Sequence, residues 1–203
     1  MANITQIKEV MKKIASYEDI GKHICFLGGS VPYIIAGEES NRDHSDIDIL
    51  VDEEYIPIIR DLLKLNNKYT EELDSLTYDM GADYGLKVFI DDVYVEFEPM
   101  KIEDNQLIRK SFSPRRKLFG TETIPFDDVE DLIIPIEIDE ISTYVETPEY
   151  IKVDKEKYKR EKDLMDIAFI DSLGIDKDKY ERVKRNVALS TEKLTSYENS
   201  KQI

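Results

Sequence analysis

Apolar residues recur at two different spacings along the chain, and each spacing predicts a different kind of element. Near the N-terminus they return every three or four positions, which is the period of an amphipathic helix: Ile4, Ile7, Val10, Met11 and Ile14. A second helix is expected over residues 55–65, where Pro57 falls in the first turn and one side carries Ile58, Leu62 and Leu65. Each of these helices has an apolar face that another part of the molecule must cover.

Four short runs are extended instead. Residues 24–27 and 47–51 are continuous apolar stretches of strand length, while 86–90 and 93–97 are rich in β-forming residues. Asp91-Asp92 separates the last two runs, which predicts a β-hairpin. Side chains on the second arm alternate between two faces, and the polar face carries Tyr94, Glu96 and Glu98.

The rest of the chain has a less regular pattern. Four prolines divide residues 112–151 into small apolar groups, so irregular loops and edge strands are expected there: Pro114, Pro125, Pro135 and Pro148. A helix that begins after Val153 is expected to end at Gly174, with a buried face made of Tyr158, Leu164, Met165, Ile167, Ala168 and Phe169. A last helix over 177–193 is expected to precede a frayed polar tail from Thr195.

Composition places the chain among globular proteins. It has 203 residues, 41% of them hydrophobic, which suits one large domain or a main domain with a small helical annex. The change of pattern suggests a division into residues 1–150 and 151–203. The sequence contains neither a long apolar run nor a signal-peptide pattern, so we expect a cytoplasmic protein without a membrane span. The single Cys25 excludes an internal disulfide and is expected in the core.

Charge narrows the choice of partners. A formal net charge of −16 argues against an extended nucleic-acid interface, which needs clustered Lys and Arg over one face. Two local basic groups remain, within residues 109–117 and 152–162, and both are interpreted first as solvated faces. The same acidity would attract a polycationic small molecule.

The strongest chemical signal follows the first predicted strand. Gly28 and Gly29 end that strand with a turn in which a phosphate can reach the backbone amides. Ser30 then occupies the expected N-cap of a helix over residues 31–36. The free N–H groups and the positive end of the helix dipole would face an anion.

Two aspartates open the second apolar strand. Because side chains alternate along a strand, Asp46 and Asp48 lie on the same side, about 6.5–7 Å apart. An unpaired charge that enters an apolar strand is costly without a cation, so shared magnesium is the simplest explanation. Two structural alternatives stay open. The glycines could serve the turn alone, and the aspartates could be solvated at the start of the strand.

These residues together resemble the signature of the DNA polymerase β-like nucleotidyltransferase superfamily: Gly28, Gly29, Ser30, Asp46 and Asp48. The longer string over residues 37–49 looks especially like the branch of lincosamide and aminoglycoside nucleotidyltransferases. Those enzymes usually carry Trp where this chain has Ser30. The resemblance implies an α/β (α+β) nucleotidyltransferase fold, with a small mixed, twisted sheet flanked by helices and a C-terminal helical segment.

The resemblance implies further site residues. It places a third carboxylate on a neighbouring strand, where Glu96 fits and Glu98 is the second choice. Residues 159–166 resemble the basic element that reaches the nucleotide phosphates through Lys162, although a surface pair with Asp166 is the structural alternative. The expected catalytic and metal-binding residues are therefore Asp46, Asp48 and Glu96, and the expected nucleotide-binding residues are Gly28, Gly29, Ser30 and Lys162. Two further residues would orient Asp46 or touch phosphate, or else lie at the surface: Arg42 and His44.

The function implied is transfer of a nucleoside monophosphate from a magnesium-bound nucleoside triphosphate to a hydroxyl group. Two Mg²⁺ ions would activate the acceptor and stabilise the leaving pyrophosphate. An aminoglycoside- or lincosamide-like acceptor is suggested by the string over residues 42–49. Two alternatives remain: a toxin-like nucleotidyltransferase that acts on transfer RNA through residues 109–117, and a catalytically silent member that binds nucleotide or a partner. A homodimer is compatible with the sequence.

Overall fold

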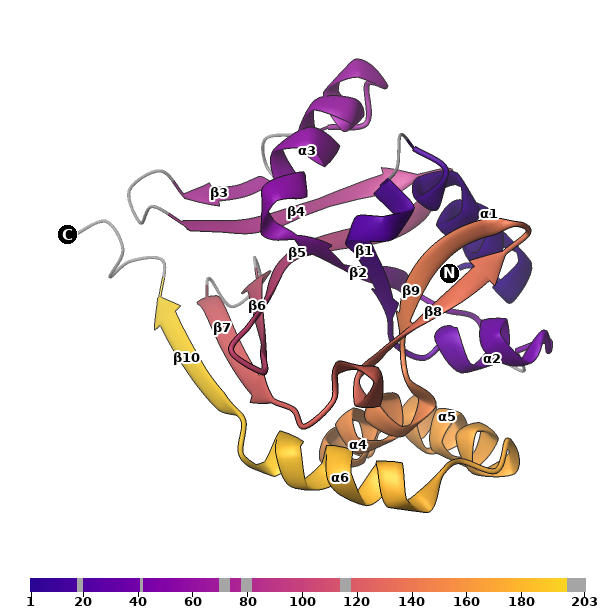
Figure 1. Ribbon diagram of the computed structural model, residues 1–203. Helices are drawn as coiled ribbons and strands as arrows, with labels where there is room; N and C mark the ends of the chain where they lie inside the picture. Colours follow the sequence, from indigo (N-terminus) through magenta and orange to yellow (C-terminus); the bar gives the residue numbers. More distant parts are fainter. Residues whose placement is uncertain (18–19, 41, 70–73, 78–81, 114–117, 197–203) are drawn as a thin grey trace.

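A curved mixed sheet organises the chain. The computed structural model describes residues 1–17, 20–40, 42–69, 74–77, 82–113 and 118–196 (Figure 1). Its strands are β1 (Ile24–Leu27), β2 (Asp46–Asp52), β3 (Asp74–Thr77), β4 (Ala82–Ile90), β5 (Val93–Glu103), β6 (Gln106–Ser113), β7 (Leu118–Pro125), β8 (Ile133–Ile138), β9 (Ile141–Glu146) and β10 (Thr191–Ser196). Its α-helices are α1 (Ile4–Ala15), α2 (Val31–Ala36), α3 (Ile56–Leu65), α4 (Pro148–Tyr158), α5 (Glu161–Ser172) and α6 (Lys177–Ala188). Short 3₁₀ helices cover Ile20–His23, Glu53–Tyr55 and Val129–Asp131.

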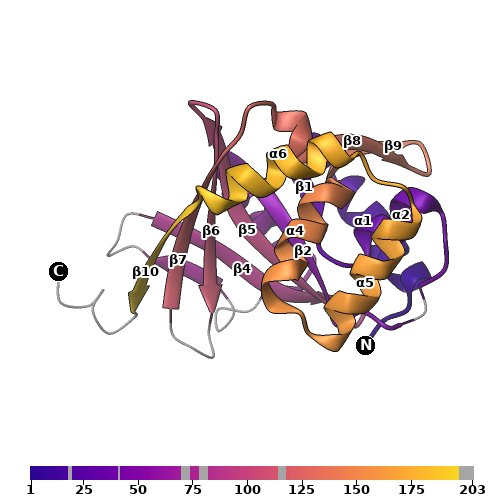
Figure 2. The same cartoon turned by 90° about the horizontal axis from the view of Figure 1, so that it is seen from below.

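The long strand β5 makes the sheet branch. The order is β10-β7-β6-β5-β2-β1-β9-β8, and β4 also pairs with β5 and carries β3. On one edge β5 pairs in parallel with β2. Its other edge pairs first with β4 and then with β6, both antiparallel. The sheet therefore bends around an interior that β6, β7 and β10 face from one side, as Figures 1 and 2 show.

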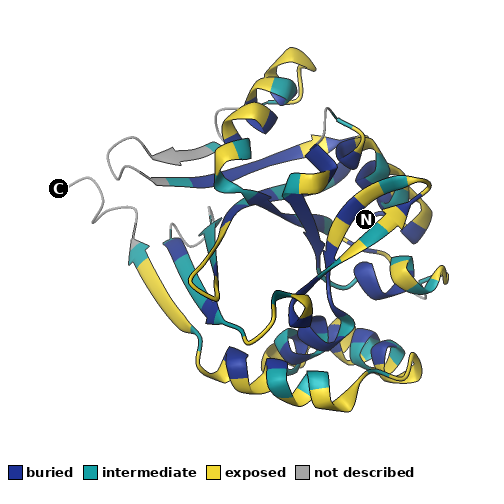
Figure 3. Cartoon of the chain, viewed as in Figure 1, coloured by how far each residue is buried: buried dark blue, intermediate teal, exposed yellow. Residues whose placement is uncertain are grey.

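Two apolar clusters hold the helices on opposite faces of the sheet. The larger cluster joins α1 and α3 to the inward residues of β2, β4 and β5, among them Ile49, Val95 and Phe97. The smaller cluster joins α4 and α6 to β1, β6 and β7 through residues such as Cys25, Leu107 and Tyr150. Figure 3 shows the buried positions gathered on the central strands, while α6 and β10 carry exposed ones. No helix within the described residues is long and apolar enough to span a membrane.

Most N-terminal predictions are confirmed. The predicted inward face of α1 is buried, and Asn3 and Gln6 form a reciprocal capping box at its start. The hairpin forms with Asp91 and Asp92 at its turn, where both residues adopt positive φ. Cys25 lies fully buried in β1.

The predicted face of the second helix was wrong. Ile58 and Leu65 are 43% and 80% exposed, and α3 instead buries Ile56, Ile59 and Leu63. An inward position that the pattern did not reveal is Arg60, which is buried between two aspartates of β3 and β4. The buried face of α3 therefore lies about one position away from the predicted face, and it includes a charged residue.

The prediction for residues 112–151 was right only in part, because an edge strand is present but most of the segment is regular sheet. Its prolines sit where strands tolerate them: Pro125 is the last residue of β7 and Pro135 lies in the edge strand β8. Pro148 starts α4, where its missing N–H costs nothing. Pro114 lies outside the described residues. With these strands included, the sheet is larger than the small one expected.

The C-terminal part differs from its prediction in two ways. The expected single helix is two, because Lys159 turns the chain at φ +51° between α4 and α5. Its expected core residues Tyr158 and Leu164 are 61% and 54% exposed. The last helix ends at Ala188, and the expected tail begins as β10, which pairs with β7. The boundary after residue 150 falls inside α4, and the C-terminal part adds a strand as well as helices.

A buried ion network fixes α4 and α5 beside the glycine turn. Asp163 and Asp166 of α5 have completely buried side chains. Arg42 binds Asp166 through two hydrogen bonds of 2.9 and 2.7 Å, and Lys155 Nζ of α4 lies 2.8 Å from the same carboxylate. Burial raises the pKa of Asp163, but hydrogen bonds from Arg160 outweigh it and hold that pKa at about 2. Three cations therefore converge on two carboxylates that could not stay charged in the core without them.

We expect Asp166→Asn to lower the free energy of unfolding by about 3–5 kcal/mol, because it leaves Arg42 and Lys155 with too little negative charge in a buried site. Asp171→Asn on the same helix is the matched control, since Asp171 is half exposed and pairs with Lys152 at the surface. Its expected cost is below about 1 kcal/mol. Urea unfolding at neutral pH measures both, and equal costs for the two variants would contradict the role of the network.

Candidate active site

Four acidic side chains lie on one face of the pair β2 and β5. The burial of β2 alternates as the sequence predicted, with Asp46 and Asp48 on the face opposite Ile47 and Ile49. In the parallel register Asp48 stands opposite Glu96, so the two carboxylates are direct cross-strand neighbours. We call the acids of this face the acid row: Asp46, Asp48, Glu96 and Glu98.

The acid row carries more negative charge than its surroundings can stabilise. Burial raises the pKa of Asp48 well above its usual range, and the charges of Asp46, Glu98 and Glu96 raise it further, against a lowering effect of Lys87. Burial also raises the pKa of Glu98 to about 7, although Arg109 acts in the opposite direction. Clustered carboxylates of this kind are typical of sites built to receive a cation or a proton.

Lys87 is a site residue that the sequence analysis missed. It lies opposite Glu96 in the hairpin, is 7% exposed, and its Nζ donates a hydrogen bond to Glu96 Oε2. The sequence could have revealed it, because a two-residue turn at Asp91 and Asp92 places residue 87 opposite residue 96. Among the described residues, Lys87 is the cation that touches the acid row directly.

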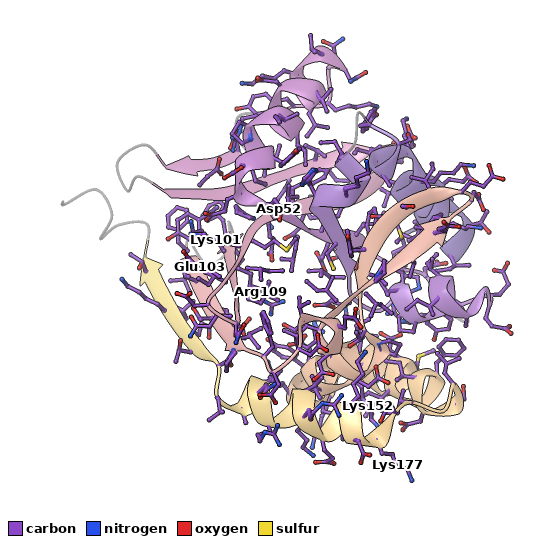
Figure 4. The ribbon with its side chains drawn as sticks, in the orientation of Figure 1. Asp52, Lys101, Glu103, Arg109, Lys152 and Lys177 are labelled. Atoms are coloured by element: carbon purple, nitrogen blue, oxygen red, sulfur yellow. The ribbon has the colours of Figure 1, made fainter. Side chains whose placement is uncertain are left out.

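A cleft of about 650 Å³ opens on one side of the acid row. It is lined by Gly28, Asp48, Glu96 and Glu98 together with Arg109, Glu122, Glu146, Asp154 and Lys157. Figure 4 shows Arg109 directed from β6 toward the interior of the curved sheet. We call this space the glycine-turn cleft.

Arg109 is the centre of a second charged group in this cleft. Its Nε donates to Glu122 at 2.6 Å, and its Nη1 lies 4.0 Å from Glu146 Oε1. The Gly28 N–H donates to Glu146 Oε2 at 3.3 Å. Burial raises the pKa of Glu146 to about 7, with Arg109 and the Gly28 amide opposing. Glu122 and Glu146 come from β7 and β9, in the segment predicted to be irregular, so the sequence did not point to them. Arg109 belongs to the basic group over residues 109–117, which was interpreted first as a solvated face.

The two glycines have separate structural reasons. Gly28 adopts φ +85°, which residues with a side chain rarely do. A Cβ on Gly29 would stand 2.2 Å from Asp166 Oδ2 and 2.3 Å from Arg42 Nη2. Ser30 is buried at the N-cap of α2, as predicted. The turn thus packs directly on the buried ion network, whatever ligand its amides receive.

The other predicted residues lie away from the acid row. Lys162 is exposed on α5 and is not among the residues that line the glycine-turn cleft, where Lys157 and Arg109 are the described cations. Arg42 is bound to Asp166, so that acid is not the surface partner of Lys162 considered above. His44 is buried, hydrogen-bonds Ser40 and bridges to Ala2. Both Arg42 and His44 therefore serve the scaffold.

The basic group expected over residues 109–117 does not form a free positive groove in the described part. Arg109 is engaged with Glu122, and Lys110 Nζ donates to Glu53 Oε1. Residues 115–117 lie outside the described residues.

The donor set of the acid row suits a hard divalent cation. Among the residues that the structure describes, no three His, Cys, Asp or Glu side chains already converge as a ready ligand set. Ser45 Oγ donates to Asp46 Oδ1, and Lys87 holds Glu96. Carboxylate oxygens are nevertheless the ligands that Mg²⁺ takes, and Lys87 is the described cation that touches the acid row.

Three comparisons with solved structures identify the fold. The antibiotic-resistance factor ANT(2'')-Ia, in a solution structure, is 17% identical, with a TM-score of 0.55 over 91% of each chain. The same protein in complex with adenylyl-2''-tobramycin is 18% identical, with a TM-score of 0.54 over 89% of this chain and 95% of that one. The lincosamide antibiotic adenylyltransferase LnuA, with lincomycin bound, is 17% identical, with a TM-score of 0.56 over 82% and 96%.

The chain therefore has a nucleotidyltransferase fold, with a twisted mixed sheet and flanking helices, as its sequence predicted. The sequence matches no protein-family model and no curated protein.

The acid row should make stability fall with rising pH. Glu98 has a native pKa of about 7 against an ordinary value of 4.5, so the native state holds more protons than the unfolded state between these values. The free energy of unfolding then decreases as the pH rises through this window. Glu98→Gln cannot ionise, and we expect it to gain about 1–3 kcal/mol over the wild type at about pH 8, with little difference at about pH 4.

Chemical unfolding with a chelator present measures this effect. Glu103→Gln, on the same strand but half exposed, is the control and should follow the wild type at every pH. A Glu98→Gln variant that loses stability in parallel with the wild type would contradict the raised pKa.

Proposed function

We propose that the protein is a metal-dependent nucleotidyltransferase that moves a nucleoside monophosphate from a nucleoside triphosphate to a hydroxyl of a small molecule. The observation that carries this proposal is the acid row: carboxylates from two adjacent parallel strands, close to a glycine turn, on a nucleotidyltransferase fold. Clustered buried charge of this kind destabilises a fold, and it is therefore typical of functional sites.

Asp46, Asp48 and Glu96 would hold Mg²⁺, two ions in the expectation drawn from the sequence. Bound magnesium would supply a Lewis acid for the phosphoryl oxygens and a lower pKa for the acceptor hydroxyl. Asp48, which stands directly opposite Glu96 and next to Asp46 on the same face, would be the central ligand. Glu98 lies next to Glu96 with a pKa near 7, which suits a group that accepts the acceptor's proton near neutral pH.

The nucleotide would occupy the glycine-turn cleft. Gly28, Gly29 and Ser30 form its turn, and Gly28 already donates its N–H to a carboxylate oxygen, which shows that this amide points at an anionic group. Arg109 and Lys157 supply positive charge to the cleft wall. Lys162, on the exposed side of α5, would contribute only if its long side chain reached the outer phosphates.

A small hydroxylated acceptor is supported by two complexes of the same fold, one with lincomycin and one with adenylyl-2''-tobramycin. The net charge of −16 supports a cationic acceptor further and speaks against transfer RNA.

We expect Asp48→Asn to reduce nucleotidyl transfer by at least about a thousandfold while the fold survives, because the variant removes a metal ligand and relieves clustered negative charge. Asp52→Asn is the matched control on the same strand, since Asp52 is 42% exposed and pairs with His23. Release of pyrophosphate from Mg-ATP over a panel of acceptors measures transfer, and circular dichroism verifies folding. Normal magnesium-dependent turnover by Asp48→Asn would refute the assignment.

The sequence and the structure point to different lysines as the phosphate ligand: Lys162 and Lys157. Lys157 lines the glycine-turn cleft and Lys162 does not. We expect Lys157→Ala to raise the KM for nucleotide about five- to tenfold, and Lys162→Ala to leave it within about twofold, because phosphate contacts by a partly exposed cation are worth roughly 1 kcal/mol. The opposite ranking in steady-state kinetics would restore Lys162 as the phosphate ligand.

A further inference from the structure

A second cleft opens on the other side of the acid row. It measures about 820 Å³, and its wall includes Asp46, Lys87, Phe89, Tyr94, Glu96 and Phe112. We call it the aromatic cleft. Glu96 and Glu98 line both this cleft and the glycine-turn cleft, so a group held in one can meet a group held in the other across the acid row.

Three aromatic rings distinguish this cleft. Phe89 of β4 is 57% exposed although it lies in a strand whose alternate residues are in the core. Its ring lies 5.2 Å from that of Tyr94 at an angle of 54°. On β6, Phe112 stacks on Phe119 with centroids 4.8 Å apart. An exposed aromatic on a wall of a concave site costs solvation free energy and is typical of a surface that receives a ring.

The electrostatics of the aromatic cleft favour a cation. Asp46, Glu96 and Glu98 contribute carboxylates, while Lys87 contributes one ammonium that is already bound to Glu96. Aromatic faces attract a cation through the ring quadrupole, and nearby carboxylates strengthen that attraction. The complementary ligand therefore has a positive charge and a ring with an apolar face.

We propose that the aromatic cleft binds the acceptor, and that the acceptor is a hydroxylated ring compound with at least one positively charged amine. This inference rests on the proposed function and adds to it the place of the acceptor and the chemistry that selects it. The ring lies against Phe89 and Tyr94, the amine faces Asp46, and a hydroxyl reaches the acid row at Glu96 and Glu98.

A nucleobase is the competing occupant, since bases also stack on aromatic rings. A triphosphate in the aromatic cleft would lie beside three carboxylates, and the lysine of that cleft, Lys87, is already bound to Glu96. The glycine-turn cleft carries more carboxylates, but it also has two cations, Arg109 and Lys157, and the Gly28 turn. The turn and these two cations favour the nucleotide in the glycine-turn cleft, which leaves the aromatic cleft to the cationic ring.

The absence of tryptophan from the sequence allows a direct binding test. Phe89→Trp introduces a single tryptophan reporter into the aromatic cleft, and Ile58→Trp places one at a 43% exposed position of α3 as the control. Each variant is titrated at about 0.15 M salt, without nucleotide, with tobramycin as the cationic probe and with its fully N-acetylated, uncharged form. We expect saturable tryptophan quenching by tobramycin in Phe89→Trp alone, and at least tenfold weaker binding of the acetylated form.

Kinetics with Phe89→Ala complete the test. We expect the KM for tobramycin to rise about five- to tenfold and the KM for Mg-ATP to stay within about twofold, since the lost contacts are those of the acceptor ring. Equal quenching in both tryptophan variants, no quenching at all, or quenching by Mg-ATP alone in Phe89→Trp would overturn the inference. Turnover with unchanged KM values in Phe89→Ala would overturn it while the proposed function stands. Specific quenching without any transfer by the wild type would uphold the cleft and refute the proposed function.

Discussion

The parallel pairing of β2 with β5 brings like charges together at the centre of the sheet. Asp48 and Glu96 are opposite each other in register, and Asp46 and Glu98 extend the same face. Burial, and then repulsion from the neighbouring acids, raises the pKa of Asp48 well above its usual range. Such an arrangement is costly unless positive charge compensates it, and Lys87 provides one positive charge. The two clefts, the pH dependence and the proposed chemistry all depend on this excess of negative charge.

The scaffold around the acid row is held by a second, fully compensated group of charges. Arg42, Lys155 and Arg160 neutralise two buried aspartates of α5. Gly29 lies so close to this group that a side chain there would collide with it. In the ion network around α5 the opposite charges balance, and the residues hold elements together. In the acid row they do not balance, which is typical of a site that receives a ligand.

The sequence revealed the local features of the site and missed those that depend on tertiary pairing. The alternation in β2, the glycine turn and the hairpin could be predicted because each depends on a short run of consecutive residues. The position of Lys87 opposite Glu96 could also have been predicted from the hairpin register, but the apolar residues on both sides of Lys87 drew attention away from it. Glu146 could not be found, because the pattern over residues 112–151 gave no sign that this segment would form β7 to β9 and approach the turn. Arg109 was noted only as part of a basic group, because its place beside Glu122 and Glu146 depends on the same tertiary pairing. The basic element over residues 159–166 was read as phosphate-binding, yet its aspartates prove to be buried partners of cations.

The most direct test of the acid row is to locate the metal. Crystals grown with Mn²⁺ and a non-hydrolysable nucleoside triphosphate would give an anomalous signal at each bound ion. We expect a peak within about 2.0–2.3 Å of carboxylate oxygens from Asp48 and at least one of Asp46 and Glu96, with the Lys87 ammonium moved off Glu96. Anomalous density elsewhere, with Lys87 still bound to Glu96 and the acid row free of metal, would contradict the assignment.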